Sequence, residues 1–293
     1  MLNRKKLIWF LLVTFAISWP LFLLPLAFRD ATIEVQQIVA LVAWSLAMFG
    51  PGVAALLTTR FVAREPLGTL NLGRLGPKRF YLWAWLLPGV LALLALVFTV
   101  ALGLGTLDLR FQAIQAGLEA LPEDVGIPLG LVLAGQILVG LTLGPLINTI
   151  PAMGEELGWR GFLLPELLSL GKWRAIVVSN VIWGVWHAPA IAQGHNYPGR
   201  PILGIFLMIG FCLLFGTILS WLYFETNSPW VAALGHGSLN ATAGLPLLFL
   251  EPGIDIVWGG TLAAPAGWIG MGLFVAWLVL SRRLPRPKPQ EPS

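Results

Sequence analysis

Three short groups of polar residues lie within otherwise apolar stretches, and together they hold the side-chain types that amide hydrolysis needs. The groups are Glu155 and Glu156 with Arg160, Trp183 with His187, and His236 with Asn240. A carboxylate or an imidazole can take a proton from water. An imidazole and an amide can donate hydrogen bonds to the oxyanion that forms on an attacked carbonyl. The pattern therefore predicts a hydrolytic site in which Glu155, His187, His236 and Asn240 are the catalytic candidates.

The same side chains permit a second chemistry at that site. Two histidines and one glutamate can hold a zinc ion and leave a fourth position open for water. Glu155, His187 and His236 would then be the metal ligands, and the residue types leave the metal-free and the zinc alternative open. The H-E-x-x-H motif of many zinc proteases is absent from the sequence.

Helical spacing assigns different roles to the two adjacent carboxylates. Residues four apart share one face of a helix, so Glu156 can pair with Arg160. Glu155 is turned about 100° away from that face and stays available for chemistry. His187 is followed two residues later by Pro189, which is expected to bend or open the helix at this point.

Each of these polar groups has a purely structural explanation when it is taken alone. Glu155, Glu156 and Arg160 would form an ion-pair cluster at a helix end, and the histidines would hydrogen-bond to neighbouring helices. Ionisable side chains are costly inside apolar surroundings, however. The presence of a carboxylate, two imidazoles and an amide in one chain therefore favours a shared site over four unrelated structural roles.

The composition places the chain in a membrane. Of its 293 residues, 57% are hydrophobic and only 11% are charged, whereas a soluble domain carries about 25% charge. The same count excludes intrinsic disorder, and the single cysteine, Cys212, excludes a disulfide scaffold. The net charge of +4 is spread between apolar runs, so we expect a lipid bilayer and no nucleic acid as its partner.

Eight apolar runs approach the roughly 20 residues that a transmembrane helix requires. They cover residues 7–28, 37–59, 80–104, 128–152, 175–193, 201–224, 229–250 and 264–281. Most basic residues between them fall on the side of both termini, and only Arg29, Arg110 and Arg200 fall on the other. We therefore expect an all-α, polytopic membrane protein with about eight transmembrane helices and both termini in the cytoplasm. A bacterial plasma membrane is the expected location, because no transit segment or retention signal is found.

The predicted site lies in the middle of the chain. Residues 1–144 are expected to form the first three transmembrane helices and the start of the fourth. Residues 145–245 are expected to form the catalytic core, and residues 246–283 the final transmembrane helix. The Pro-rich tail, residues 284–293, is expected to be disordered.

In their order along the chain, the three groups resemble the CPBP family, which comprises the type II CAAX prenyl endopeptidases and their bacterial Abi-type relatives. The resemblance rests on Glu155-Glu156-x-x-x-Arg160, on an aromatic-x-x-x-His at Trp183 and His187, and on His236-x-x-x-Asn240. It covers roughly residues 145–245. Trp183 stands where the family generally has Phe, and because both are large aromatics the resemblance holds.

The resemblance implies an intramembrane endopeptidase of the metallo- or glutamate type, built as an eight-helix bundle. Its site would open towards the inner face and the lipid. By the same resemblance, Glu155 and His187 would activate the water, and His236 and Asn240 would form the oxyanion hole. Zinc is the cofactor that the metallo-type alternative would require.

The remaining motif residues are expected to support the site. By the resemblance, Glu156 and Arg160 would maintain its fold, with Trp183 beside them. The implied substrate is a peptide or protein in or at the membrane, and the family name points to a prenylated C-terminal peptide.

Two other functions stay open at the level of the sequence. The first is a non-enzymatic membrane protein, for immunity or partner binding, on the same scaffold. The second is a proton-coupled transporter in which Glu155, His187 and His236 form a relay. The presence of all four reactive side chains favours the enzyme.

Overall fold

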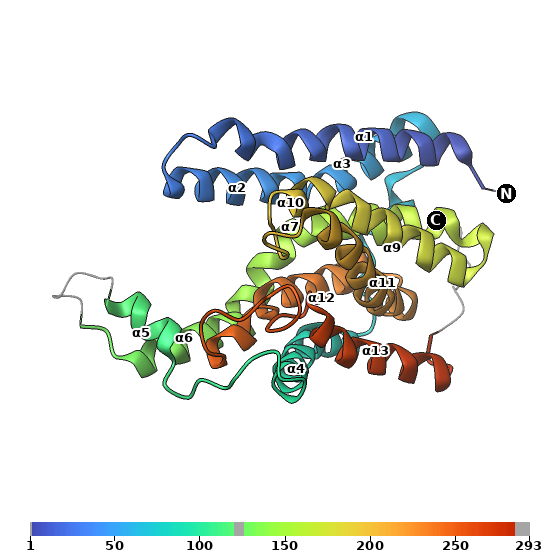
Figure 1. Ribbon diagram of the computed structural model, residues 1–293. Coiled ribbons are helices and arrows are strands. Elements are labelled where there is room, and N and C mark those ends of the chain that lie inside the picture. Colours follow the sequence, from blue (N-terminus) through green and yellow to red (C-terminus); the bar gives the residue numbers. More distant parts are fainter. Residues whose placement is uncertain (1, 120–125, 285–293) are drawn as a thin grey trace.

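The computed structural model describes residues 2–119 and 126–284, and the regular elements within them are helices (Figure 1). No strand occurs within these residues, which confirms the predicted all-α class. The predicted disordered tail lies outside the described residues, apart from Leu284 at its start.

Four helical segments are long and apolar enough to cross a bilayer. They are α1 with η1 (Arg4–Phe28), the run of α2, α3 and η2 (Ile33–Ala63), α4 (Arg79–Ala101) and α11 (Pro201–Thr226). A fifth candidate is a bent pair, in which α6 (Leu129–Leu141) meets the helical run that begins with α7 (Leu143–Gly158) at 42°. These segments indicate an integral membrane protein with several spans.

The predicted count of eight spans is not decided by these helices. Three further predicted runs contain α9 (Lys172–Trp186), α12 (Pro229–Thr242) and α13 (Pro265–Leu280), which have 15, 14 and 16 residues. Each is shorter than the roughly 20 residues that cross a bilayer unaided. Eight spans and two cytoplasmic termini therefore stay predictions.

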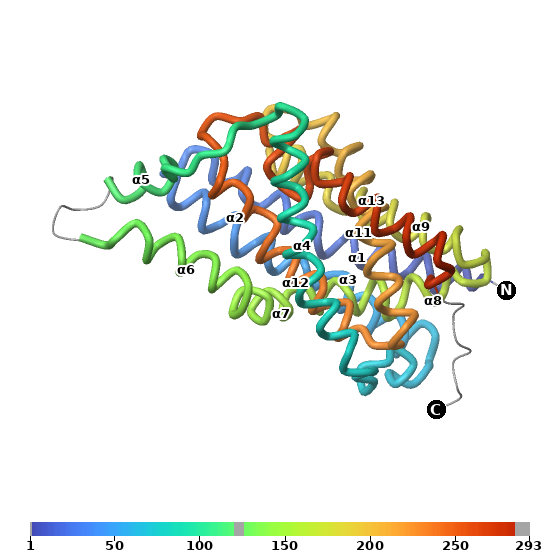
Figure 2. Tube along the Cα trace, turned by 90° about the horizontal axis from the view of Figure 1, so that it is seen from below, coloured from blue at the N-terminus to red at the C-terminus, as the bar shows by residue number. Residues whose placement is uncertain are grey.

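The helices form three layers, of which the middle one holds the residues of interest (Figure 1). The long helix α1 lies along one side together with α2 (Ile33–Ala47) and α3 (Gly50–Leu57). The middle holds α7, α9, α11 and α12, and α4 and α13 cover the opposite side. Figure 2 shows that α6 and the short α5 (Gln112–Glu119) extend away from this body at one end.

The central helix α7 continues past its last regular turn. It passes into a π-helical turn, η4 (Trp159–Leu163), and then into α8 (Leu164–Leu167) and η5 (Leu168–Leu170). The residues from Glu155 to Arg160 therefore lie on one unbroken helical path. Such π-helical turns are uncommon and are often found at functional sites.

The break predicted at Pro189 is present. Helix α9 ends at Trp186, His187 is its C-cap residue, and the short α10 (Ala188–Ala192) follows. Pro189 lacks an amide hydrogen, and its ring would clash with a carbonyl of the preceding turn if α9 continued. His187 is thus held at a helix end, where its side chain is only partly buried.

Helices α3 and α7 approach each other at backbone distance. A Cβ placed on Gly154 would lie 2.7 Å from the Phe49 Cα, and one placed on Gly52 would lie 2.6 Å from the Gly154 oxygen. A Cβ on Gly158 would overlap Pro51. Backbone atoms cannot swing aside as a side chain does, so this crossing requires glycine directly before Glu155.

Substitution of Gly154 by alanine should therefore destabilise the fold. We expect Gly154→Ala to lower the free energy of unfolding by about 1–3 kcal/mol, the usual cost of inserting a methyl group into packed atoms. The measurement is the unfolding midpoint of the purified protein in detergent. Gly135→Ala on α6 is the control, because a Cβ there has no heavy atom within 4 Å. Equal midpoints for the two variants would contradict the close crossing.

Candidate active site

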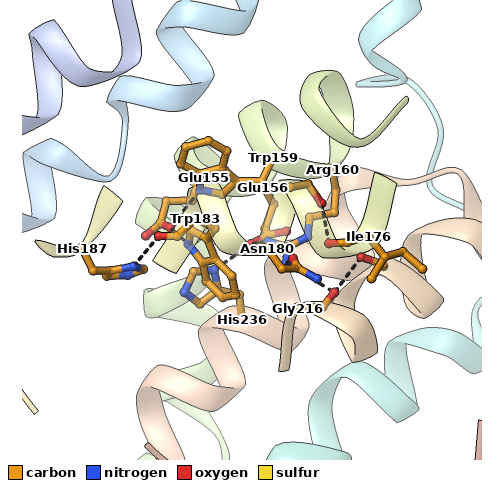
Figure 3. A network of polar contacts seen from close by, with 12 residues as sticks. Glu155, Glu156, Trp159, Arg160, Ile176, Asn180, Trp183, His187, Gly216 and His236 are labelled. Atoms are coloured by element: carbon orange, nitrogen blue, oxygen red, sulfur yellow. Dashed lines mark hydrogen bonds and ion pairs between the residues drawn. The ribbon is translucent and has the colours of Figure 1, made fainter. Parts of the chain in front are cut away.

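Most of the polar residues that the sequence singles out lie close together (Figure 3). Helix α7 and its η4 extension provide the two glutamates and Arg160, α9 provides Trp183 and, at its C-cap, His187, and α12 provides His236. The helices come from distant parts of the chain, so this meeting is a product of the tertiary fold.

Glu156 is the carboxylate of the pair that has charged partners, all of them at Oε1, whereas its Oε2 has no hydrogen bond to the described residues. Its Oε1 accepts a hydrogen bond from Arg160 Nη1 at 2.8 Å, with 0% and 1% of the two side chains exposed. The same oxygen lies 2.9 Å from Nδ1 of His236, which therefore donates to it. The predicted i,i+4 pair of Glu156 and Arg160 is confirmed. A carboxylate buried this deeply is stable only with such partners.

Glu155 has neutral partners in place of charged ones. Its Oε2 accepts hydrogen bonds from the indole Nε1 of Trp159 at 3.2 Å and of Trp183 at 2.6 Å. The residue is 1% exposed. Within the described residues its other oxygen, Oε1, has no hydrogen bond, so this atom is available to a further molecule.

Both histidines of the site are fixed through Nδ1. His187 Nδ1 lies 2.8 Å from the carbonyl oxygen of Trp183, and His236 Nδ1 lies against Glu156 as described above. A carbonyl and a carboxylate only accept hydrogen bonds, so each Nδ1 must carry its proton. In the described part of the chain neither Nε2 is engaged. A hydrogen bond at one ring nitrogen fixes which nitrogen carries the proton and how the imidazole is oriented.

Arg160 is held from a second side. Its Nη2 donates to Asn180 Oδ1 at 3.1 Å and approaches the Gly216 carbonyl oxygen at 3.5 Å. A Cβ on Gly216 would overlap the amide of Asn180, so glycine leaves room for this amide against α11. The guanidinium also stacks 4.5 Å above the ring of Trp183.

Asn240 does not join this network. It lies one helical turn after His236 on α12, but its residue is exposed, and it makes no side-chain hydrogen bond to the described residues. Its predicted role in an oxyanion hole is untested by the geometry.

The three predicted zinc ligands do not form a ready metal site. Within residues 2–119 and 126–284, no three His, Cys, Asp or Glu side chains gather closely enough to hold a metal ion. The atoms that Glu155, His187 and His236 retain for a further partner are one carboxylate oxygen and two Nε2 atoms. Zinc accordingly stays a prediction of the sequence.

Comparison with known families agrees with the residues that meet here. Residues 136–242 match the family model described as type II CAAX prenyl endopeptidase Rce1-like. This stretch is therefore similar to the Rce1-like family. It contains every predicted site residue from Glu155 to Asn240, and it confirms the family resemblance drawn from the three motifs. A search of curated proteins gave no match to the chain.

Three contributors to the Rce1-like site were not assigned a role from the sequence. Trp159 stands four residues after Glu155, so the spacing rule that paired Glu156 with Arg160 also predicts its contact. Asn180 lies seven residues before His187 and so on the same stripe of α9, a spacing that indicates an inward position but no partner. For Gly216 the sequence offers no signal, because its role depends on where α11 packs.

Removal of the Arg160 charge should lower the stability of the protein more than removal of the charge of an exposed arginine. We expect Arg160→Met to lower the free energy of unfolding by about 3–5 kcal/mol, because Glu156 would lose its buried cation. Arg174→Met is the control, since Arg174 is exposed on the first turn of α9. Unfolding midpoints in detergent measure both. A variant at Arg160 as stable as the control would show that the buried pair does not maintain the site.

Proposed function

We propose that the chain is an intramembrane endopeptidase that hydrolyses a peptide bond near the cytoplasmic side of the membrane. The observation that carries the proposal is a buried carboxylate, Glu155, with one uncommitted oxygen beside two imidazoles with uncommitted Nε2 atoms. The Rce1-like match over residues 136–242 supports a peptidase, since the family is one of endopeptidases.

In the proposed reaction, Glu155 is the base that activates water. Its Oε1 takes a proton from the water, and the water oxygen forms a bond to the carbonyl carbon of the substrate. The carbonyl electrons move onto the carbonyl oxygen, which becomes the oxyanion. His187 orients the water through Nε2, because the Trp183 carbonyl holds its Nδ1. When the C–N bond breaks, the leaving amine takes the proton that Glu155 received.

His236 and Asn240 are the proposed donors to the oxyanion. His236 already donates from Nδ1 to Glu156, so its Nε2 can donate only when the ring carries both protons. An imidazolium and Arg160 then balance the charges of Glu155 and Glu156. Apolar surroundings favour such a neutral total, because an unbalanced charge there is costly. Asn240 supplies an exposed amide one turn further along α12.

The route described uses only groups of this chain, which corresponds to the glutamate type of peptidase. If zinc were bound, it would polarise the water and the substrate carbonyl as a Lewis acid. Elemental analysis of the purified protein, together with activity before and after chelation, separates the two types.

The substrate class that we propose is a peptide or protein segment at the membrane. A prenylated C-terminal peptide is one form of it, and it is the form that the family description names. The bacterial plasma membrane remains our proposed location.

The decisive variants are Glu155→Gln and His187→Ala. Each should reduce cleavage by about 100-fold or more, the usual contribution of a general base or of its partner, while the folded protein stays abundant. The assay follows cleavage of peptides with and without a farnesylated cysteine by purified protein in lipid nanodiscs, read by mass spectrometry.

Glu251→Gln and His195→Ala are the matched controls for these variants. Glu251 is exposed, and His195 packs its ring against Trp44 and makes no side-chain hydrogen bond to the described residues. Both should cleave at the wild-type rate. Near wild-type cleavage by Glu155→Gln would overturn the proposal, and a partner-binding protein or a transporter would then be favoured.

A further inference from the structure

Trp183 contacts four of the five charged or titratable groups of the site. Its indole Nε1 donates to Glu155 Oε2 at 2.6 Å, and its carbonyl oxygen accepts from His187 Nδ1 at 2.8 Å. Its ring lies 4.5 Å below the Arg160 guanidinium and meets the ring of His236 edge to face, with 5.3 Å between centroids. Figure 3 shows this residue between the carboxylates and the two imidazoles.

The hydrogen bond to Glu155 has a directional consequence. A carboxylate turns readily about its last side-chain torsion, because the energy wells of that torsion are broad. Here two indoles, Trp159 and Trp183, donate to the same oxygen, Oε2. They therefore hold the carboxylate in one orientation and leave Oε1 for water. Both donors are neutral, so they stabilise the negative charge without adding a counter-charge that would compete with a substrate.

The partners of Trp183 also connect the base to the imidazole. One peptide unit and one side chain of the same residue fix Glu155 and His187. Their relative position then depends on the rotamer of Trp183, which is 1% exposed and confined by the stack with Arg160. Pre-organisation of this kind lowers the barrier because the reacting groups need not be ordered during the reaction.

We propose that Trp183 is a positioning residue that sets the reactive orientation of Glu155 through its indole N–H. The proposal rests on the endopeptidase function above. It gives the residue a role that the phenylalanine typical of this position cannot perform, since a phenyl ring has no hydrogen to donate. The motif is thus altered in chemistry as well as in shape.

The test compares Trp183→Phe with Trp221→Phe. Trp221 is also buried, but it packs against Phe80 and Phe274 away from the site, and its Nε1 has no partner among the described residues. Trp183→Phe should lower kcat by roughly 10- to 100-fold, the range expected for one hydrogen bond to a charged group. KM should stay within about twofold, because the bond acts on the base and not on the substrate. Trp221→Phe should leave both constants unchanged.

A second variant separates the hydrogen bond from the shape of the ring. In β-(3-benzothienyl)alanine a sulfur replaces the indole N–H and the bicyclic shape is kept, so the fold is preserved if Trp183→Phe proves unstable. This analogue at position 183 should reproduce the fall in kcat. Wild-type kcat in the analogue would overturn the inference.

Glu155→Gln, assayed in parallel, distinguishes the two proposals. If it is inactive while the analogue at position 183 is fully active, the endopeptidase proposal stands and the role of Trp183 is wrong. If it retains wild-type activity, the base itself is wrong, and the positioning role fails with it.

Discussion

Two adjacent carboxylates are buried in an apolar helical bundle, and the rest of the site follows from the need to accommodate them. Glu156 receives a guanidinium and an imidazole, while Glu155 receives two indole N–H groups. An unpartnered charge at this depth would cost several kcal/mol. Helices α9 and α12 must therefore converge on α7 and its η4 extension, and this convergence gives Glu156 charged partners and Glu155 neutral ones.

Close backbone packing makes this convergence possible. Glycines on α3 and α7 allow the two helices to touch at backbone level next to Glu155, and Gly216 on α11 leaves room for the Asn180 amide. The break after α9 then places His187 at a helix end, where its imidazole is only partly buried.

Helical spacing and the chemistry of proline were sufficient to predict much of this arrangement. The i,i+4 spacing predicted the pair of Glu156 and Arg160, and the chemistry of proline predicted the break before Pro189. The order of the three motifs predicted the family that residues 136–242 match. Helix ends were less predictable, since the run 229–250 ends as a helix at Thr242 and the run 128–152 bends at Thr142. Hydropathy reports the apolar character of a run, but it does not report where a helix stops.

Tertiary contacts were beyond these rules. The Trp183 indole reaches Glu155 across 28 positions of sequence, and Gly216 lies 56 positions from the arginine whose partner it accommodates. Both contacts depend on how helices pack, which a periodicity does not encode. For the same reason, treating Trp183 and phenylalanine as equivalent large aromatics overlooked a hydrogen bond that only the indole makes.

The different roles of the two glutamates, Glu156 in stability and Glu155 in chemistry, are tested most directly by the stability of two isosteric variants. Unfolding midpoints of Glu155→Gln and Glu156→Gln would be measured side by side in the same detergent. We expect Glu156→Gln to lower the free energy of unfolding by about 3 kcal/mol or more, because Arg160 and His236 lose their buried anion, whereas Glu155→Gln should remain as stable as the wild type. Equal losses of stability in the two variants, or an unchanged stability of Glu156→Gln, would contradict these different roles of the two glutamates.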